Sequence, residues 1–276
     1  MAQKPVPNAL TLELDPIVDA NLTRHLDSEE PWFAHDYVPF EQGENFAFLG
    51  GRDWDPSQVT LPKHVTDALE ILLINKDNLA GYHRELVFSF ILEKWWGRWL
   101  GRWTAEEHLH AIALRNYLVV TREIDPTANE DVRVEHVMKG YRADAYSQLE
   151  RLAFMAFYER AHAVFCRNLE AQISEPVLKG LIGRIANDEE RHEVFWANLV
   201  THCLESRRDE TIDAIAKRAA ELHVIGADID AYQDKVAAVA EAGIFDEAAL
   251  RQAISDRITA WGLAEEPKLH AFVNAG

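Results

Sequence analysis

The chain is poor in cysteine and in long apolar runs. It has 276 residues but only two cysteines, Cys166 and Cys203. Two cysteines cannot make a disulfide framework, so we expect free thiols and a reducing, cytoplasmic setting. No run of about 18 apolar residues is present, and the N-terminal residues lack the apolar core of a secretory signal. We therefore expect a protein that is neither transmembrane nor exported.

Basic charge is also scarce. The chain has 28 Lys and Arg against 46 Asp and Glu, a formal net charge of −18. Nucleic-acid binding relies on basic patches, so no nucleic-acid partner is expected. We find no nucleophile elbow, phosphate-binding loop or paired-cysteine zinc pattern, which argues against those chemistries.

Strand patterns are nearly missing, whereas apolar residues recur with the helical period. We expect a first helix at 9–26, an irregular stretch at 27–63, a shorter helix near 129–140, and three or four short helices over 208–263. Four longer helices are expected at 64–91, 93–122, 143–173 and 176–205. No linker or repeat divides the chain. The pattern therefore predicts a single all-α domain over residues 1–276, with a central bundle at about 64–205 and additional peripheral helices.

Two of the long helices carry the same cluster of acids and histidine inside apolar surroundings. The clusters read "EEHLH" at 106–110 and "DEERH" at 188–192. Positions i and i+3 are neighbours on a helix, so Glu107 projects with His110 and Glu189 with His192. Two Glu-x-x-His pairs, with one Glu from each of two other helices, form the di-iron site of ferritin-like bundles. A divalent cation would also remove the cost of burying these acids.

A further carboxylate is needed, and "FYERAHAVF" at 157–165 supplies Glu159. His162 follows three residues later, as an extra ligand or as a core histidine with hydrogen-bond partners. The choice of Glu within each pair stays open by one residue, because Glu106 and Glu190 flank the pairs and Glu106 is four residues from His110.

Four segments resemble motifs of the soluble acyl-acyl-carrier-protein desaturases. They are "WTAEEHLH" (103–110), "NDEERHE" (187–193), "YERA" (158–161) and "WDP" (54–56). The resemblance covers roughly residues 30–205 and is best with the shorter, actinobacterial DesA-type members. It implies a ferritin-like bundle, usually a homodimer. In this family two irons activate dioxygen and remove two hydrogens from an acyl chain on acyl carrier protein, with electrons from a ferredoxin-type donor.

The resemblance also implies roles for individual residues. Glu107 and Glu189 would bridge the two metal ions, His110 would complete one, and Glu159 with His192 would complete the other. Asp188 and Trp54 would form a supporting pair beside a ligand histidine. An acidic partner of this kind orients a ligating imidazole by accepting its other N–H.

Two positions depart from the family pattern. Counting back from "LAGY" (79–82) places Lys76 where the family has a ligand Glu, and His162 stands where the plant enzymes have a Thr. A cation at position 76 disfavours the metal ion beside His110, so we expect one ion, iron or manganese, on the side of Glu159 and His192. The ammonium could pair with Glu107 or Glu189 instead.

Two alternative functions remain open beside desaturation. One is another dioxygen-dependent oxygenase on the same scaffold, with His162 as an extra ligand. The other is a catalytically impaired homologue that binds acyl carrier protein or acyl chains, which Lys76 favours. Trp103 is interpreted as core packing, with a role in electron transfer as the alternative.

Overall fold

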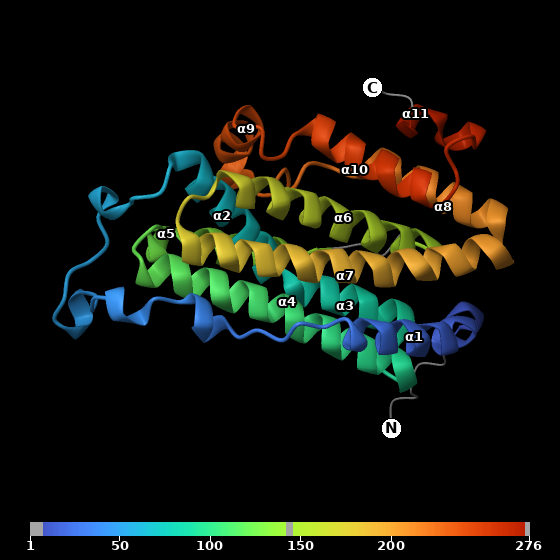
Figure 1. Ribbon diagram of the computed structural model, residues 1–276, viewed down its shortest axis with the longest axis horizontal. Coiled ribbons are helices and arrows are strands. Elements are labelled where there is room, and N and C mark those ends of the chain that lie inside the picture. Colours follow the sequence, from blue (N-terminus) through green and yellow to red (C-terminus); the bar gives the residue numbers. More distant parts are fainter. Residues whose placement is uncertain (1–7, 142–145, 274–276) are drawn as a thin grey trace.

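The structure is a computed structural model that describes residues 8–141 and 146–273, and helices are its regular secondary structure (Figure 1). The α-helices are α1 (Ala9–Asp27), α2 (Lys63–Asp77), α3 (Leu79–Phe90), α4 (Lys94–Val120), α5 (Pro126–Lys139), α6 (Gln148–Gln172), α7 (Pro176–Ser206), α8 (Arg208–Glu221), α9 (Gln233–Glu241), α10 (Glu247–Ala260) and α11 (His270–Val273). Short 3-10 turns are η1 (Ala34–Tyr37), η2 (Phe40–Gln42), η3 (Ala47–Leu49), η4 (Pro56–Gln58), η5 (Asp230–Tyr232) and η6 (Pro267–Leu269). The described residues contain no strand, which confirms the all-α prediction.

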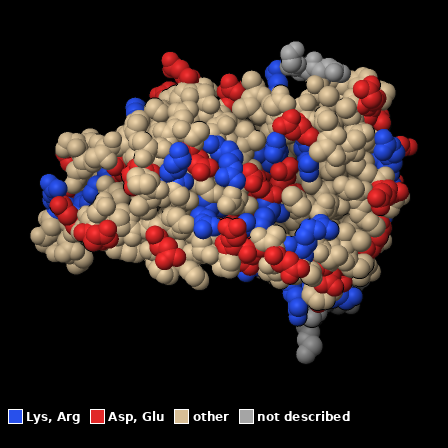
Figure 2. All heavy atoms as spheres, in the orientation of Figure 1, with Lys and Arg blue, Asp and Glu red and all other residues tan. Residues whose placement is uncertain are grey.

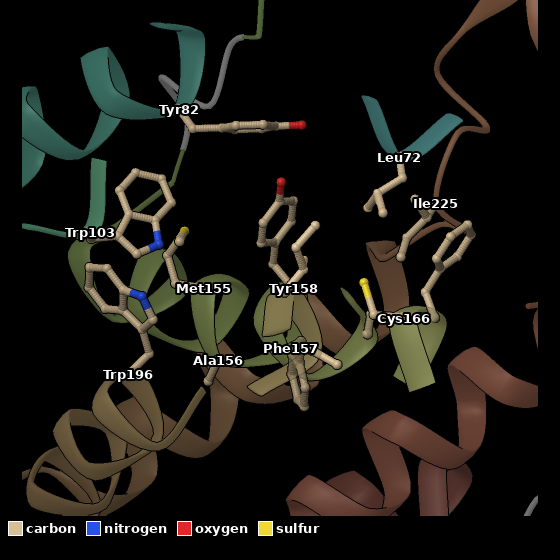
Figure 3. Packing of buried hydrophobic residues seen from close by; sticks show 14 of the residues in the cluster. Leu72, Tyr82, Trp103, Met155, Ala156, Phe157, Tyr158, Cys166, Trp196 and Ile225 are labelled. Atoms are coloured by element: carbon tan, nitrogen blue, oxygen red, sulfur yellow. The ribbon is translucent and has the colours of Figure 1, made fainter. Parts of the chain in front are cut away.

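The long helices pack side by side as a bundle. In Figure 1, α7 crosses the front between α4 and α6, and α1 lies across the front of the bundle. Helices α8 and α10 pack against α6 on the side away from α4, and they are among the short peripheral helices that were predicted over 208–263. The interior is apolar: Figure 3 shows Trp103, Met155 and Trp196 together in the core, and both indoles are fully buried. A single domain over residues 1–276 stays a prediction.

Caps fix where the central helices begin. The Ser147 hydroxyl accepts from the backbone N–H of Glu150, and the backbone N–H of Ser147 donates to the Glu150 carboxylate, which is a capping box at the start of α6. Asp125 and Glu175 accept backbone N–H groups at the starts of α5 and α7, each directly before a proline at the first helical position. Helix α5 therefore begins earlier than predicted. The predicted helix 143–173 starts at Gln148, and its residues 143–145 lie outside the described ones.

The helix predicted over 64–91 is broken at Asn78, so the prediction of one continuous helix was wrong. Helix α2 ends at Asp77 and α3 begins at Leu79, with Asn78 at φ −78° and ψ 9° between them. The Asn78 amide nitrogen lies 3.3 Å from His136 Nε2. Polar residues in this turn face the interior because they find partners there: Asn75 and Lys76 are 5% and 1% exposed.

The first residues of the irregular segment between α1 and α2 run along the bundle. Trp32 lies there with 8% of its surface exposed, against the helices that carry the two acid clusters. Within the described part of the chain, none of the helices combines the length and the apolarity that a membrane crossing requires.

Candidate metal centre

The five residues predicted to bind metal converge in the middle of the bundle. Helix α4 contributes Glu107 and His110, α6 contributes Glu159, and α7 contributes Glu189 and His192, each at most 2% exposed. One ligand atom from each of Glu107, Glu159, Glu189 and His192 lies within 4.8 Å of the others. His110 Nδ1 lies 3.2 Å from Glu189 Oε1 and 3.5 Å from Glu107 Oε1. The cluster can therefore hold a metal ion.

The structure also decides which glutamate of each pair faces this centre. Glu107 and Glu189 point inward, whereas Glu190 pairs with Arg167 at 2.8 Å on the outside of the bundle. Glu106 lies behind His192 rather than inside the cluster.

Lys76 reaches the same carboxylate oxygen as His110, which is Glu189 Oε1, and so lies on the side of the centre that includes His110. Its Nζ donates to Glu107 Oε2 at 2.8 Å and to Glu189 Oε1 at 2.6 Å, and its side chain is fully buried. The expected pairing of the ammonium with these two carboxylates is present. The register that placed Lys76 at the family's Glu position is consistent with this geometry.

Unpaired atoms in the centre test whether a metal ion fits. Glu107 Oε1, His110 Nδ1, Glu159 Oε2, Glu189 Oε2 and His192 Nδ1 are buried and have no hydrogen-bond partner. These atoms belong to the five predicted ligands. Buried polar atoms are normally paired, and leaving one unpaired costs about 1–3 kcal/mol. Imidazole and carboxylate together suit ions such as iron or manganese. The residues present therefore fit a metal ion.

The charges of the centre are strongly coupled. Burial by itself would lower the pKa of Lys76, but the charges of Glu107, Glu189 and Glu159 outweigh it and raise this pKa, so the ammonium keeps its proton. Burial raises the pKa of Glu159 to about 8, with the charges of Glu107 and Glu189 adding to it. For Glu189 the raising effects of burial and of Glu107 are outweighed, mainly by Lys76, and its pKa falls to about 2. Glu159 is therefore the carboxyl that holds a proton until a cation displaces it.

Asp188, a carboxylate of the α7 motif, holds His110 of the α4 motif. His110 Nε2 lies 2.9 Å from Asp188 Oδ2, and Trp32 Nε1 donates to the same oxygen at 2.9 Å. The Trp32 ring lies parallel to the His110 ring, with the centroids 6.1 Å apart. Asp188 therefore takes the predicted supporting position.

The prediction that Trp54 partners Asp188 was wrong. The Trp54 indole donates to the carbonyl of Arg122 at 2.9 Å, beyond the C-terminal end of α4. The chain leaving α1 brings Trp32 against α7 instead. Trp32 carries no motif of its own, so only the fold could identify it.

The second histidine is held in the matching way. His192 Nε2 lies 2.7 Å from Glu106 Oε2, and His25 Nε2 of α1 lies 3.0 Å from the same carboxylate oxygen. Glu106 thus relates to His192 as Asp188 relates to His110. Both motifs read acid-Glu-x-x-His, and this doubled acid was the sequence signal for Glu106. His25 had no such signal.

His162 and Trp103 lie beside the cluster and not among its grouped ligand atoms. His162 Nδ1 is 2.9 Å from the Tyr158 carbonyl oxygen, and its Nε2 is 2.9 Å from Asn75 Oδ1. Burial, with the charge of Lys76, lowers the pKa of His162 to about 4, so the ring is neutral. Trp103 Nε1 donates to Glu159 Oε1 at 2.8 Å and so orients that carboxyl group.

A cavity of ≈ 660 Å³ opens beside His162, a size typical of small-molecule pockets. Asn75 and Tyr158 form part of its wall, and they directly precede Lys76 and Glu159 in the chain. The cavity wall and the metal centre therefore use neighbouring residues of α2 and α6. The other walls of the cavity come from α5, α6 and residues 221–228.

Comparison with known proteins identifies the family. A family model described as fatty acid desaturase matches residues 8–273. DesA2 of Mycobacterium tuberculosis H37Rv, named for acyl-acyl-carrier-protein desaturase activity, is 76% identical over 99% of this chain and 99% of its own length. DesA1 of the same organism is 33% identical over 89% of this chain and 75% of its own. An X-ray structure of DesA2 superimposes with a TM-score of 0.85 and 68% identity, and covers 96% of this chain and 100% of that one. The chain thus belongs to the fatty acid desaturase family, as an actinobacterial DesA-type member with the helical ferritin-like fold.

Proposed function

We propose that this chain is an acyl-acyl-carrier-protein desaturase of fatty acid metabolism whose centre holds one metal ion, iron or manganese, where the family holds two irons. The single-ion part of this proposal rests on Lys76, whose ammonium pairs with both Glu107 and Glu189. Each unit of charge at about 4 Å contributes about 4 kcal/mol against another unit charge at an effective dielectric constant near 20. The ammonium thus takes over part of the charge that the second ion would supply.

The residues on the other side of the centre support a single ion there. Glu159 and His192 offer unpaired ligand atoms, and Glu107 and Glu189 each keep one unpaired oxygen. When bound, the metal ion supplies dioxygen activation for the removal of hydrogens from the acyl chain. Glu159 must first lose its proton, and Trp103 then holds the carboxylate in place.

Three further parts of the proposal concern the surroundings of the chain. Acyl carrier protein delivers the acyl chain, as the names of the relatives indicate, and the cavity beside His162 receives it. A ferredoxin-type donor supplies the electrons. The chain acts as a homodimer, because large apolar side chains such as Phe48 and Phe88, 97% and 78% exposed, favour association. It acts in the cytoplasm, because its two buried free thiols suit a reducing compartment.

A second candidate function rests on the same lysine. With the site beside His110 filled by an ammonium, the chain would bind acyl carrier protein or its acyl chain without desaturating it. Lys76 favours this function because it removes one of the two metal positions used by the family.

Metal analysis and product analysis on the purified chain distinguish the two. We expect about one metal ion per chain by plasma mass spectrometry, and slow formation of an unsaturated acyl product from acyl-acyl carrier protein with a ferredoxin reducing system. Binding of the acylated carrier with no product would support the second candidate. Two fully occupied metal positions in the unmodified chain would contradict the proposed effect of Lys76.

A further inference from the structure

A second cavity, of ≈ 520 Å³, lies between α1 and α7. Its volume is in the range of small-molecule pockets. The walls are formed by Asn21, Arg24, His25, Arg191, Val194 and Phe195 together with polar residues at the rim. None of these residues lines the cavity beside His162.

Among the described residues, Arg24 is the one charged group lining this cavity that has no oppositely charged partner, since Arg191 pairs with Asp188 and His25 contacts Glu106. Glu30 and Glu190 lie at the rim, but each is already paired at 2.8 Å, with Arg184 and Arg167 respectively. Arg24 and Arg191 both line the cavity. The face of the molecule in Figure 2 shows basic and acidic side chains mixed along a central band.

Arg24 is held in place without an acidic partner. Its NH1 donates to Asn21 Oδ1 at 2.7 Å, and Asn198 donates to the same oxygen at 2.8 Å. Among residues 8–141 and 146–273, no carboxylate forms an ion pair with Arg24. The charge of Arg24 therefore remains available to a ligand.

We propose that this cavity binds an organic monocarboxylate, with the carboxylate on Arg24 and Arg191 and a short apolar chain against Val194 and Phe195. Guanidinium groups bind carboxylates through paired, charge-assisted hydrogen bonds. An inorganic anion would satisfy the arginines but would leave the apolar wall without a partner.

The same cavity connects to both histidines of the metal centre. Arg191 donates to Asp188, which holds His110, and His25 contacts Glu106, which holds His192. A carboxylate on Arg191 competes with Asp188 for the guanidinium and adds negative charge near the centre, so it tightens metal binding. Coupling between two sites is reciprocal, and metal binding therefore tightens carboxylate binding by the same factor. This coupling rests on the proposed metal centre, whereas the carboxylate site itself does not.

Calorimetric titration of the full, metal-free chain with hexanoate tests the site. We expect saturable binding of one hexanoate, with hexanol and inorganic phosphate binding at least about tenfold more weakly, because each lacks one of the two interactions. R24Q should weaken hexanoate binding about tenfold or more, and R24K should retain part of it. R98Q is the matched control, since Arg98 is exposed and stacks on Trp95.

Three results would overturn the carboxylate site. They are the lack of saturable binding, phosphate binding as tight as hexanoate, and hexanoate binding that R24Q leaves unchanged. The last of these would place the ligand outside this cavity, for example in the cavity beside His162. Circular dichroism melting of each variant confirms that it is folded, and R24K tests the site where R24Q is unstable.

Manganese titration with and without saturating hexanoate tests the coupling separately. We expect hexanoate to tighten Mn²⁺ binding severalfold and Mn²⁺ to tighten hexanoate binding by an equal factor. Unequal or missing effects would refute the coupling. A chain that binds hexanoate but no Mn²⁺ would contradict the proposed metal centre and leave the carboxylate site supported.

Discussion

Replacing Lys76 by glutamate should raise the metal content from one ion per chain toward two. The Lys76 ammonium lies 2.8 Å from Glu107 and 2.6 Å from Glu189, on the side of the centre next to His110. The substitution K76E exchanges a positive charge for a negative one and adds a carboxylate ligand. With about 4 kcal/mol per unit charge at about 4 Å, the change of two units far exceeds the cost of losing one buried ion pair.

Desolvation of the second ion reduces this gain, but even about 2 kcal/mol corresponds to a roughly thirtyfold change in the binding constant. Plasma mass spectrometry gives the metal content, and titration with Fe²⁺ or Mn²⁺ gives the number of sites. We also expect K76E to form the unsaturated acyl product faster than the unmodified chain, since two ions restore the composition of the family's centre.

The control is K179E, which makes the same charge change on an exposed lysine in the first turn of α7. Its metal content should stay at one per chain. If K76E also stays at one, or if the unmodified chain already binds two ions, then Lys76 does not limit the second site and the electrostatic argument fails.

The remaining predictions concern single groups around the centre. Metal binding should strengthen as pH rises toward 8, because the Glu159 carboxyl with a pKa of about 8 must release its proton. His192 must also be neutral, and although burial by itself would lower its pKa, the carboxylates around it outweigh that effect and raise this pKa; titrations between pH 6 and 9 that show no slope would contradict these roles. E106Q should weaken binding of the single ion about 10- to 100-fold, because Glu106 orients His192, whereas D188N should have a much smaller effect. Equal losses in a metal titration would show that the ion lies between the two histidines. K76M should destabilise the metal-free chain by about 3–5 kcal/mol at pH 7, since it leaves buried carboxylates without their cation. Urea unfolding in the presence of a chelator measures this loss, and urea unfolding with excess Mn²⁺ and no chelator measures its recovery.

The sequence could predict those parts of the site that lie on one helix. Glu107 and His110 are one turn apart on α4, as Glu189 and His192 are on α7, so helix geometry alone brings each pair together. Family resemblance then placed Lys76, and its contacts agree with that register.

Contacts between distant segments were not predictable in this way. Asp188 was assigned Trp54 as its partner because a short motif matched, but Trp32 donates to it. Which indole reaches α7 depends on how the chain crosses the bundle after α1, and no local pattern encodes that path. The break at Asn78 is similar, because the polar residues before it are stabilised by groups from other helices.

The arrangement of the centre explains why one substitution could change its metal content. Helices α4 and α7 contribute the same set of groups: a Glu that pairs with Lys76, a His one turn later, and a preceding acid that holds the His of the other helix. These two helices therefore offer equivalent groups to the two metal positions of the family. The remaining helices do not, since α6 offers Glu159 to one position and α2 offers Lys76 to the other. If the centre holds a single ion, as we propose, its position must then follow from this last pair, and we expect the ammonium, which already pairs with Glu107 and Glu189, to direct the ion to the side of Glu159.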